Sequence, residues 1–216
     1  MVRSAKNVLG QRILKRQRQV LTADRDEAAG SHHQPCDDSA AGEVTAHYSQ
    51  SVHLPAWDSI CECIPLGSRI LDVGCGAAQF AHLLMDRKIP GAYVGFDLSP
   101  AAVEIATLRL PGSRVELADA RTTDLFSSVD YDIVVFAEVL AHLVDDVPVL
   151  KRVPREKHIL ATVPGFESAS HLRSFQNTGE VLDRYRCQFS SLEISEHHTG
   201  GANGSGDTFF LLNGVR

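Results

Sequence analysis

Two glycines and two acidic residues stand at positions where the chain could bind a ligand. Gly74 and Gly76 follow an apolar run, and Asp97 and Asp119 follow the next two apolar runs. Glycines in a strand-to-helix turn let backbone amides approach a ligand that side chains would block. A carboxylate at Asp97 can accept both hydroxyl hydrogens of a ribose, and Asp119 is placed for an adenine amino group. Together they predict a site for an adenosine-containing ligand.

Short apolar runs that alternate with helical patterns predict the scaffold for these residues. Strands of this composition are typical of a buried sheet. The predicted strands are 69–73, 92–96, 113–117, 131–136 and 158–163, and the predicted helices are 52–64, 78–86 and 100–108. Because strand and helix alternate, we expect a parallel sheet whose turns meet at one edge.

The last part of the chain has a different pattern. Two strand-like runs, 192–195 and 208–212, flank the turn-rich segment 199–206, which predicts an antiparallel hairpin at the far edge of the sheet. The predicted fold class is α/β. It is a Rossmann-like, seven-stranded, mostly parallel sheet with a C-terminal antiparallel hairpin and helices on both faces.

Residues 1–46 are predicted to be an N-terminal arm and linker, and residues 47–216 a single domain. A chain of 216 residues has room for one α/β domain of about 150–200 residues with an extension. Residues 1–18 carry six basic side chains and no acidic one, with apolar residues at helical spacing, and 23–43 is typical of a linker. We expect a frayed extension; a polyanion-binding arm or a transit peptide is the alternative.

The composition excludes several classes of protein. Apolar residues make up 44% and charged residues 22%, which is typical of a globular protein. Outside the arm, the remaining 15 basic residues face 27 acidic ones, which argues against a broad surface for duplex nucleic acid. Five cysteines and no secretory leader predict a cytoplasmic location. No apolar run reaches the ~18–20 residues of a membrane span.

Four motifs, in order, resemble the class I S-adenosylmethionine-dependent methyltransferases. They are LDVGCG at 71–76, GFDLS at 95–99, ADA at 118–120 and FAEVLAHL at 136–143. The resemblance covers most of the chain from Tyr48 onward. It implies S-adenosyl-L-methionine as cofactor and S-adenosyl-L-homocysteine as product. It also implies that the Gly74–Gly76 loop holds the methionine part, Asp97 the ribose and Asp119 the adenine.

The cofactor-binding residues implied by this resemblance come from all four motifs. They are Asp72, Gly74, Cys75, Gly76, Asp97, Leu98, Asp119, Ala120 and Phe136. Ala78 stands where the family often has a third glycine, and we expect it to alter the loop shape without abolishing binding. Gln79 occupies the position where a nicotinamide dehydrogenase would need the last glycine of its fingerprint, which argues against that class.

The implied reaction is an in-line attack of a nucleophile on the sulfonium methyl. Alignment supplies most of the catalysis, and a general base is needed only where the nucleophile holds a proton. His142 and His171 are the candidate bases, and Tyr48, Glu138 and Arg173 the candidate acceptor-binding residues. Glu138 and His142, four apart, are expected on one helix face. Arg173 would suit an anionic acceptor. The alternatives are Glu138 as a helix cap, His142 as a packed side chain and Arg173 as a solvated helix residue.

The predicted function is methylation of a small-molecule acceptor at oxygen, nitrogen or carbon. One alternative is a catalytically inactive methyltransferase-like binding protein, and another is an RNA methyltransferase that uses the basic arm. Glu138, His142 and His171 faintly resemble the metal-binding pattern of small-RNA 3′-terminal 2′-O-methyltransferases. Ala141 replaces a glutamate of that pattern, so we expect no metal. No membrane partner is expected, and the sequence does not specify an oligomeric state.

Overall fold

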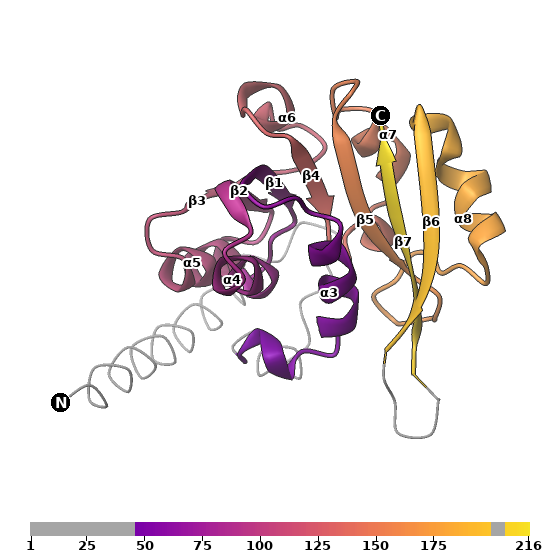
Figure 1. Ribbon diagram of the computed structural model, residues 1–216, viewed down its shortest axis with the longest axis horizontal. Helices are drawn as coiled ribbons and strands as arrows, with labels where there is room; N and C mark the ends of the chain where they lie inside the picture. Colours follow the sequence, from indigo (N-terminus) through magenta and orange to yellow (C-terminus); the bar gives the residue numbers. More distant parts are fainter. Residues whose placement is uncertain (1–45, 200–205) are drawn as a thin grey trace, which may run out of the picture.

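A seven-stranded sheet forms the centre of the molecule, with the strand order β3-β2-β1-β4-β5-β7-β6 (Figure 1). The computed structural model describes residues 46–199 and 206–216. The strands are β1 (Ser68–Val73), β2 (Pro90–Asp97), β3 (Arg114–Leu117), β4 (Ile133–Phe136), β5 (His158–Pro164), β6 (Ser191–His198) and β7 (Thr208–Val215).

The pairing of the strands confirms the predicted fold class. Strands β1 to β5 pair in parallel, whereas β7 pairs antiparallel with β5 and β6 pairs antiparallel with β7. In Figure 1, β7 lies between β5 and β6, so the hairpin forms the far edge of the sheet. The strand order reverses between β1 and β4, and open α/β sheets bind ligands at such a point, outside the carboxyl ends of the strands.

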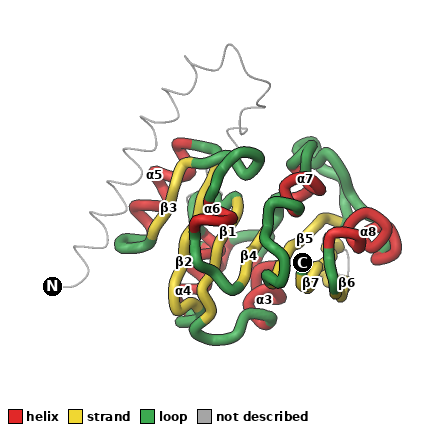
Figure 2. The backbone as a smooth tube through the Cα atoms, turned by 90° about the horizontal axis from the view of Figure 1, so that it is seen from above, coloured by secondary structure: helices red, strands yellow, loops and turns green. Residues whose placement is uncertain are grey.

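Helices cover both faces of the sheet. The α-helices are α3 (Leu54–Glu62), α4 (Gln79–Asp86), α5 (Pro100–Arg109), α6 (Leu125–Ser128), α7 (Asp146–Leu150) and α8 (Thr178–Tyr185), and the 3-10 helices are η1 (Tyr48–Gln50), η2 (Leu140–His142) and η3 (Arg186–Gln188). One buried cluster joins α3, α4 and α5 to the sheet, and the other joins α6, α7 and α8 to it. In Figure 2, α3 and α7 lie on opposite sides of the strands.

The two cores follow from the alternation of side chains along the strands. In β1, Ile70 belongs to the cluster under α3, α4 and α5, whereas Leu71 and Val73 belong to the cluster under α6, α7 and α8. Both faces of β1 are therefore buried. Helix α5 begins where Ser99 accepts a hydrogen bond from the amide of Ala102, with a proline in its first turn.

The predicted element bounds differ from the structure mainly at strand ends. The predicted helices at 52–64, 78–86 and 100–108 correspond to α3, α4 and α5, and β2 begins at Pro90, two residues before its predicted start. Strand β4 begins at Ile133, whereas 131 was predicted. Tyr131 is instead buried in the preceding loop, where its hydroxyl donates to the carbonyl of Phe126 at 3.0 Å.

The predicted arm and linker lie almost entirely outside the described residues. Within the described part, contacts with the domain begin at Ala46, whose carbonyl accepts from the side-chain amide of Gln79 at 3.0 Å. The turn of the C-terminal hairpin, predicted at 199–206, is described only at its two ends. Among the described residues, no helix has the length and the apolar composition needed to cross a membrane.

Candidate functional site

The turn after β1 has the backbone conformation that its glycines predict. Gly74 and Gly76 have φ values of +66° and +53°. A Cβ on Gly74 would lie 2.7 Å from Val139, so this loop packs directly on the loop after β4. A Cβ on Gly76 would meet nothing within 4 Å, which leaves its backbone open to a ligand. Ala78 also has a left-handed backbone, with φ +59°, so it takes the conformation that a glycine favours there.

Asp97 joins the end of β2 to the glycine loop. Its Oδ2 accepts from the amide of Gly76 and its Oδ1 from the amide of Ser99, each at 2.9 Å. Each carboxylate oxygen has a further lone pair, so the group can still accept hydrogen bonds from two hydroxyls of a ligand over the loop. The structure therefore brings together the two motifs on which the sequence prediction depends.

The third motif lies beside the second. The amide of Ala118 donates to the carbonyl of Asp97 at 2.9 Å, and Leu98, at the same edge, is 42% exposed. Both oxygens of Asp119 contact Arg121, whose Nη2 lies 2.7 Å from Oδ2. This pair orients the carboxylate and uses part of its acceptor capacity. Ala120 packs against the core under α6 and α7.

A cleft of about 420 Å³ opens where the loop after β4, the start of α3 with the residues before it, and the turn end of the C-terminal hairpin meet. Its lining residues are Ser51, Val52, His53, Leu54, Pro55, Ala56, Glu138, Phe166, Thr199, Gly206, Asp207 and Phe209. Glu138 Oε1 is buried with no hydrogen-bond partner among the described residues. The residue also has a left-handed backbone, with φ +57°. A buried unpaired carboxylate oxygen and a strained backbone are both typical of a binding site.

Sequence comparison identifies the central part of the chain. A family model for the methyltransferase domain matches residues 71–155. A trans-aconitate 2-methyltransferase of Methylobacterium nodulans is 39% identical over 67 residues, which cover 30% of this chain and 26% of that protein. A phthiotriol/phenolphthiotriol dimycocerosates methyltransferase of Mycobacterium leprae is 35% identical over 74 residues, 33% of this chain and 27% of that protein. The matched segments thus cover less than a third of the length of these relatives.

Solved structures share the fold over about three quarters or more of the chain. A chain of the Haloferax volcanii complex between the Trm112 methyltransferase activator and a methyltransferase is 14% identical, with a TM-score of 0.63 over 84% of this chain and 99% of that chain. An S-adenosylmethionine-dependent methyltransferase of Mesorhizobium loti is 16% identical, with a TM-score of 0.60 over 78% of this chain and 100% of that chain. A Haemonchus contortus phosphoethanolamine N-methyltransferase, in complex with phosphomonomethylethanolamine and S-adenosylhomocysteine, is 14% identical. Its TM-score is 0.57, and the match covers 76% of this chain and 52% of that chain.

Residues 71–155 thus match the methyltransferase domain family, and the fold is the one found in solved S-adenosylmethionine-dependent methyltransferases. The four sequence motifs lie where the sequence predicts them, at the carboxyl ends of β1, β2, β3 and β4. The glycine loop, Asp97 and the Ala118 amide contact one another directly. These contacts form a continuous edge on which the class I cofactor would lie.

Two side chains that the sequence assigned to the site make their contacts away from the cleft. Tyr48 does not line the cleft, because its hydroxyl donates to Asp86 at the last turn of α4, at 2.8 Å. Phe136 is fully buried and stacks on Phe126, with the ring centroids 6.4 Å apart. Its side chain lies inside the core, so only its backbone reaches the cofactor edge. The predicted roles of Tyr48 at the acceptor and of Phe136 at the cofactor stay predictions.

Arg173 has a structural contact in place of the predicted acceptor contact. Its Nη1 donates to the carbonyls of Leu140 and Leu143, both at 2.6 Å, and lies 3.2 Å from the buried carboxylate of Asp146. The segment 171–173 is not helical, and the Arg173 side chain is only 16% exposed. Arg173 therefore holds the segment after β5 against η2 and α7.

The structure places His142 and His171 side by side. Their ring centroids are 5.1 Å apart in an edge-to-face arrangement. The prediction that Glu138 and His142 share a helix face is wrong. Glu138 has a left-handed backbone, and the helix that follows is a single 3-10 turn that begins at Leu140. The amide of Glu138 donates instead to the Thr162 hydroxyl at 2.8 Å.

The hydrogen bond of His142 fixes which ring nitrogen can accept a proton. Nδ1 lies 2.9 Å from the carbonyl of Ser170 and therefore carries the ring proton, which leaves a lone pair on Nε2. The residue keeps access to solvent, but burial by the groups packed around the ring lowers the pKa of His142 below its usual value. The imidazole is accordingly neutral at pH 7, as a general base must be.

Asp72 lies beneath the glycine loop, where no solvent reaches it. Only 1% of the residue is exposed, and its Oδ2 accepts from the Tyr93 hydroxyl at 2.8 Å. Burial raises the pKa of Asp72 to about 7. Its predicted role in cofactor binding is thus one of support from behind the loop.

We expect Asp72→Asn to stabilise the folded protein at alkaline pH. Because the pKa of Asp72 is higher in the folded protein than in the unfolded chain, its contribution to the free energy of unfolding depends on pH. That contribution is complete at pH values below the pKa of the unfolded chain and is lost as the pH rises through about 7. Asparagine does not titrate, so at pH 8 the variant should melt roughly 5 °C above the wild type. This corresponds to about 2 kcal/mol in the free energy of unfolding. Thermal melts at pH 5 and pH 8, with Asp130→Asn as an exposed control, test this. An equal difference at both pH values would contradict it.

Proposed function

We propose that this chain is an S-adenosylmethionine-dependent methyltransferase that methylates a small-molecule acceptor. The observation that carries the proposal is the hydrogen bond between Asp97 and the amide of Gly76, at 2.9 Å. It joins the acid suited to a ribose to the loop suited to a methionine moiety. The fit is supported by the open space in front of Gly76, where even a Cβ would meet nothing within 4 Å.

The assignment to a small molecule is supported by the cleft and by the relatives. The cleft of about 420 Å³ is within the usual range for small-ligand pockets. The relatives matched over part of their length are named for trans-aconitate and for phthiotriol dimycocerosates. The RNA alternative depends on residues 1–18, which lie outside the described part of the chain.

The chain's own residues would act mainly by alignment. The bound cofactor supplies a methyl group on a positively charged sulfur. Asp97 and the loop Gly74–Gly76 would hold that molecule at the edge of the sheet. Glu138 Oε1, buried and unpaired among the described residues, would accept a hydrogen bond from the acceptor and direct its nucleophile. His142 Nε2 would take the proton of a hydroxyl or ammonium acceptor.

Replacement of His142 by alanine should lower kcat by roughly 100-fold or more while KM for the methyl donor stays unchanged, because the base acts on the acceptor. Since burial lowers the pKa of His142, kcat/KM of the wild type should rise with pH through a pKa below 6.5 and be flat above pH 7. Steady-state assays with labelled methyl donor from pH 5 to 8 measure both. His198→Ala, on the exposed hairpin, is the control. Full turnover by His142→Ala would remove it as the base.

Isothermal titration of the full chain with S-adenosylhomocysteine tests the proposed function first. One site per chain is expected, and folded protein that binds neither this molecule nor S-adenosylmethionine would overturn the proposal. A panel of carboxylic acids, alcohols and amines with labelled methyl donor then tests catalysis. Cofactor binding with no methyl transfer to any member would favour the inactive binding protein.

A further inference from the structure

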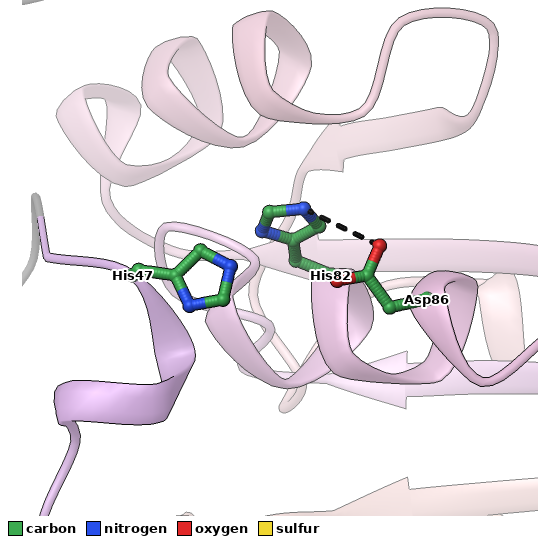
Figure 3. Close-up of side chains that lie close together, drawn as sticks. All are labelled: His47, His82 and Asp86. Atoms are coloured by element: carbon green, nitrogen blue, oxygen red, sulfur yellow. Dashed lines mark ion pairs between the residues drawn. The ribbon is translucent and has the colours of Figure 1, made fainter.

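We propose that His47, His82 and Asp86 form a binding site for one divalent transition-metal ion of the zinc type. Each offers one ligand atom, and these three atoms all lie within 4.8 Å of one another. Figure 3 shows His82 and Asp86 projecting from α4, with His47 facing them from the segment that precedes η1. None of the three lines the cleft beside Glu138.

The donor set suits such an ion. Two imidazoles and one carboxylate, with water in the fourth position, form a tetrahedral site of the kind that Zn²⁺ occupies in proteins. At metal–ligand distances of about 2.0–2.2 Å, the ligand atoms of such a site are roughly 3.4 Å apart. The side chains of His82 and Asp86 are 32% and 49% exposed, so small rotations can close the remaining distance.

Helix geometry already aligns two of the ligands. His82 and Asp86 are four residues apart on α4, and Nε2 of the histidine lies 3.8 Å from Oδ1 of the aspartate. The Tyr48 hydroxyl donates to the other carboxylate oxygen, Oδ2, at 2.8 Å. Such a hydrogen bond to the outer oxygen fixes the carboxylate and leaves Oδ1 for the ion.

The third ligand is also held by a neighbour. Nδ1 of His47 accepts a hydrogen bond from the amide of Ser49 at 3.2 Å and lies 2.9 Å from the Ser49 hydroxyl oxygen, so Ser49 orients the ring. The rings of His47 and His82 are 5.1 Å apart.

An ion at this site would connect two parts of the chain that are 35 positions apart in sequence. It would fix the start of the described domain to the helix that follows the glycine loop. His47 is also four residues before Ser51, the first residue of the cleft lining. The ion would therefore stabilise the wall of the cleft as well as the N-terminal segment.

Titration of the metal-free full chain with Zn²⁺ at pH 7.5 tests the site. We expect tight binding of one ion and a rise in melting temperature, with His47→Ala, His82→Ala and Asp86→Asn each weakening that binding at least tenfold. His198→Ala is the matched control. Its Nε2 lies the same 3.8 Å from a carboxylate, Glu196 Oε1, but it belongs to no group of three ligands among the described residues. Its affinity for Zn²⁺ should equal that of the wild type.

Two outcomes would overturn the proposal. One is Zn²⁺ binding whose affinity and stoichiometry survive both His47→Ala and Asp86→Asn in variants with a native circular dichroism spectrum. The other is a thiolate charge-transfer band in the absorption spectrum of the Co²⁺-substituted protein, which would show that a cysteine binds the ion. Tetrahedral Co²⁺ absorption without that band, lost in His82→Ala, supports the site.

Discussion

Replacement of Asp97 by alanine should lower the affinity for S-adenosylhomocysteine by roughly 100-fold. The carboxylate is expected to accept hydrogen bonds from two ribose hydroxyls, and loss of a charged acceptor for both costs about 3 kcal/mol. The variant also loses the bonds to the amides of Gly76 and Ser99, which hold the glycine loop in place. Both effects act in the same direction, and isothermal titration of wild type and variant measures their sum.

Two further variants make the result interpretable. Asp97→Asn keeps one carbonyl oxygen for an amide or a hydroxyl, so its affinity should lie between those of wild type and alanine variant. Asp130→Ala removes an exposed acid from the turn before β4, at the opposite edge of the sheet, and should bind like the wild type. If the affinity of folded Asp97→Ala for S-adenosylhomocysteine is within threefold of the wild-type affinity, Asp97 does not hold the ribose.

The cofactor edge could be predicted from sequence because its determinants are local. A buried strand, two glycines and a helix pattern specify the turn at Gly74–Gly76, and the same strand-to-helix pattern recurs before Asp97. Parallel strands bring their carboxyl ends to one edge, so the contact between Asp97 and Gly76 follows from the topology. The fold class was predictable for the same reason.

The acceptor side was less predictable because its contacts join distant segments. Arg173 resembles a residue for an anionic acceptor, but its guanidinium binds carbonyls about thirty residues earlier, at Leu140 and Leu143. The left-handed backbone of Glu138 breaks the helical spacing to His142, and no residue type at 138 signals it. The i, i+4 spacing of His82 and Asp86 was visible in the sequence, but the position of His47 beside them was not.

Replacement of Asp146 by alanine should destabilise the protein by about 3 kcal/mol, or roughly 10 °C in melting temperature. Asp146 is 1% exposed and accepts from Nε and Nη2 of Arg184 at 2.7 Å and from the Tyr185 hydroxyl at 2.8 Å, with Arg173 at 3.2 Å. Its loss leaves two guanidinium groups without their anion. We place the cost at the lower end of the range for buried pairs because the Arg184 side chain is 36% exposed and can turn to water.

Urea denaturation at two pH values tests this role of Asp146. Burial raises the pKa of Asp146, but the hydrogen bonds from Arg184 and Tyr185 outweigh burial and hold it below 3.8. A lowered pKa gives stability that is present above the unfolded pKa and is lost as pH falls through the folded one. The difference between wild type and Asp146→Ala should therefore be full at pH 7 and shrink below about pH 4. A decrease of under 1 kcal/mol in the free energy of unfolding of Asp146→Ala at pH 7 would contradict this stabilising role.

The same variant separates the cofactor edge from the acceptor side. Asp146 helps to hold Arg173, and the segment that carries Arg173 also carries Phe166 of the cleft and the candidate base His171. None of the contacts of Asp146 reaches the glycine loop or Asp97. Under conditions where Asp146→Ala remains folded, its affinity for S-adenosylhomocysteine should stay within a few-fold of the wild type, whereas methyl transfer should fall. Equal losses of both would show that the two halves of the site are coupled through the core under α6, α7 and α8.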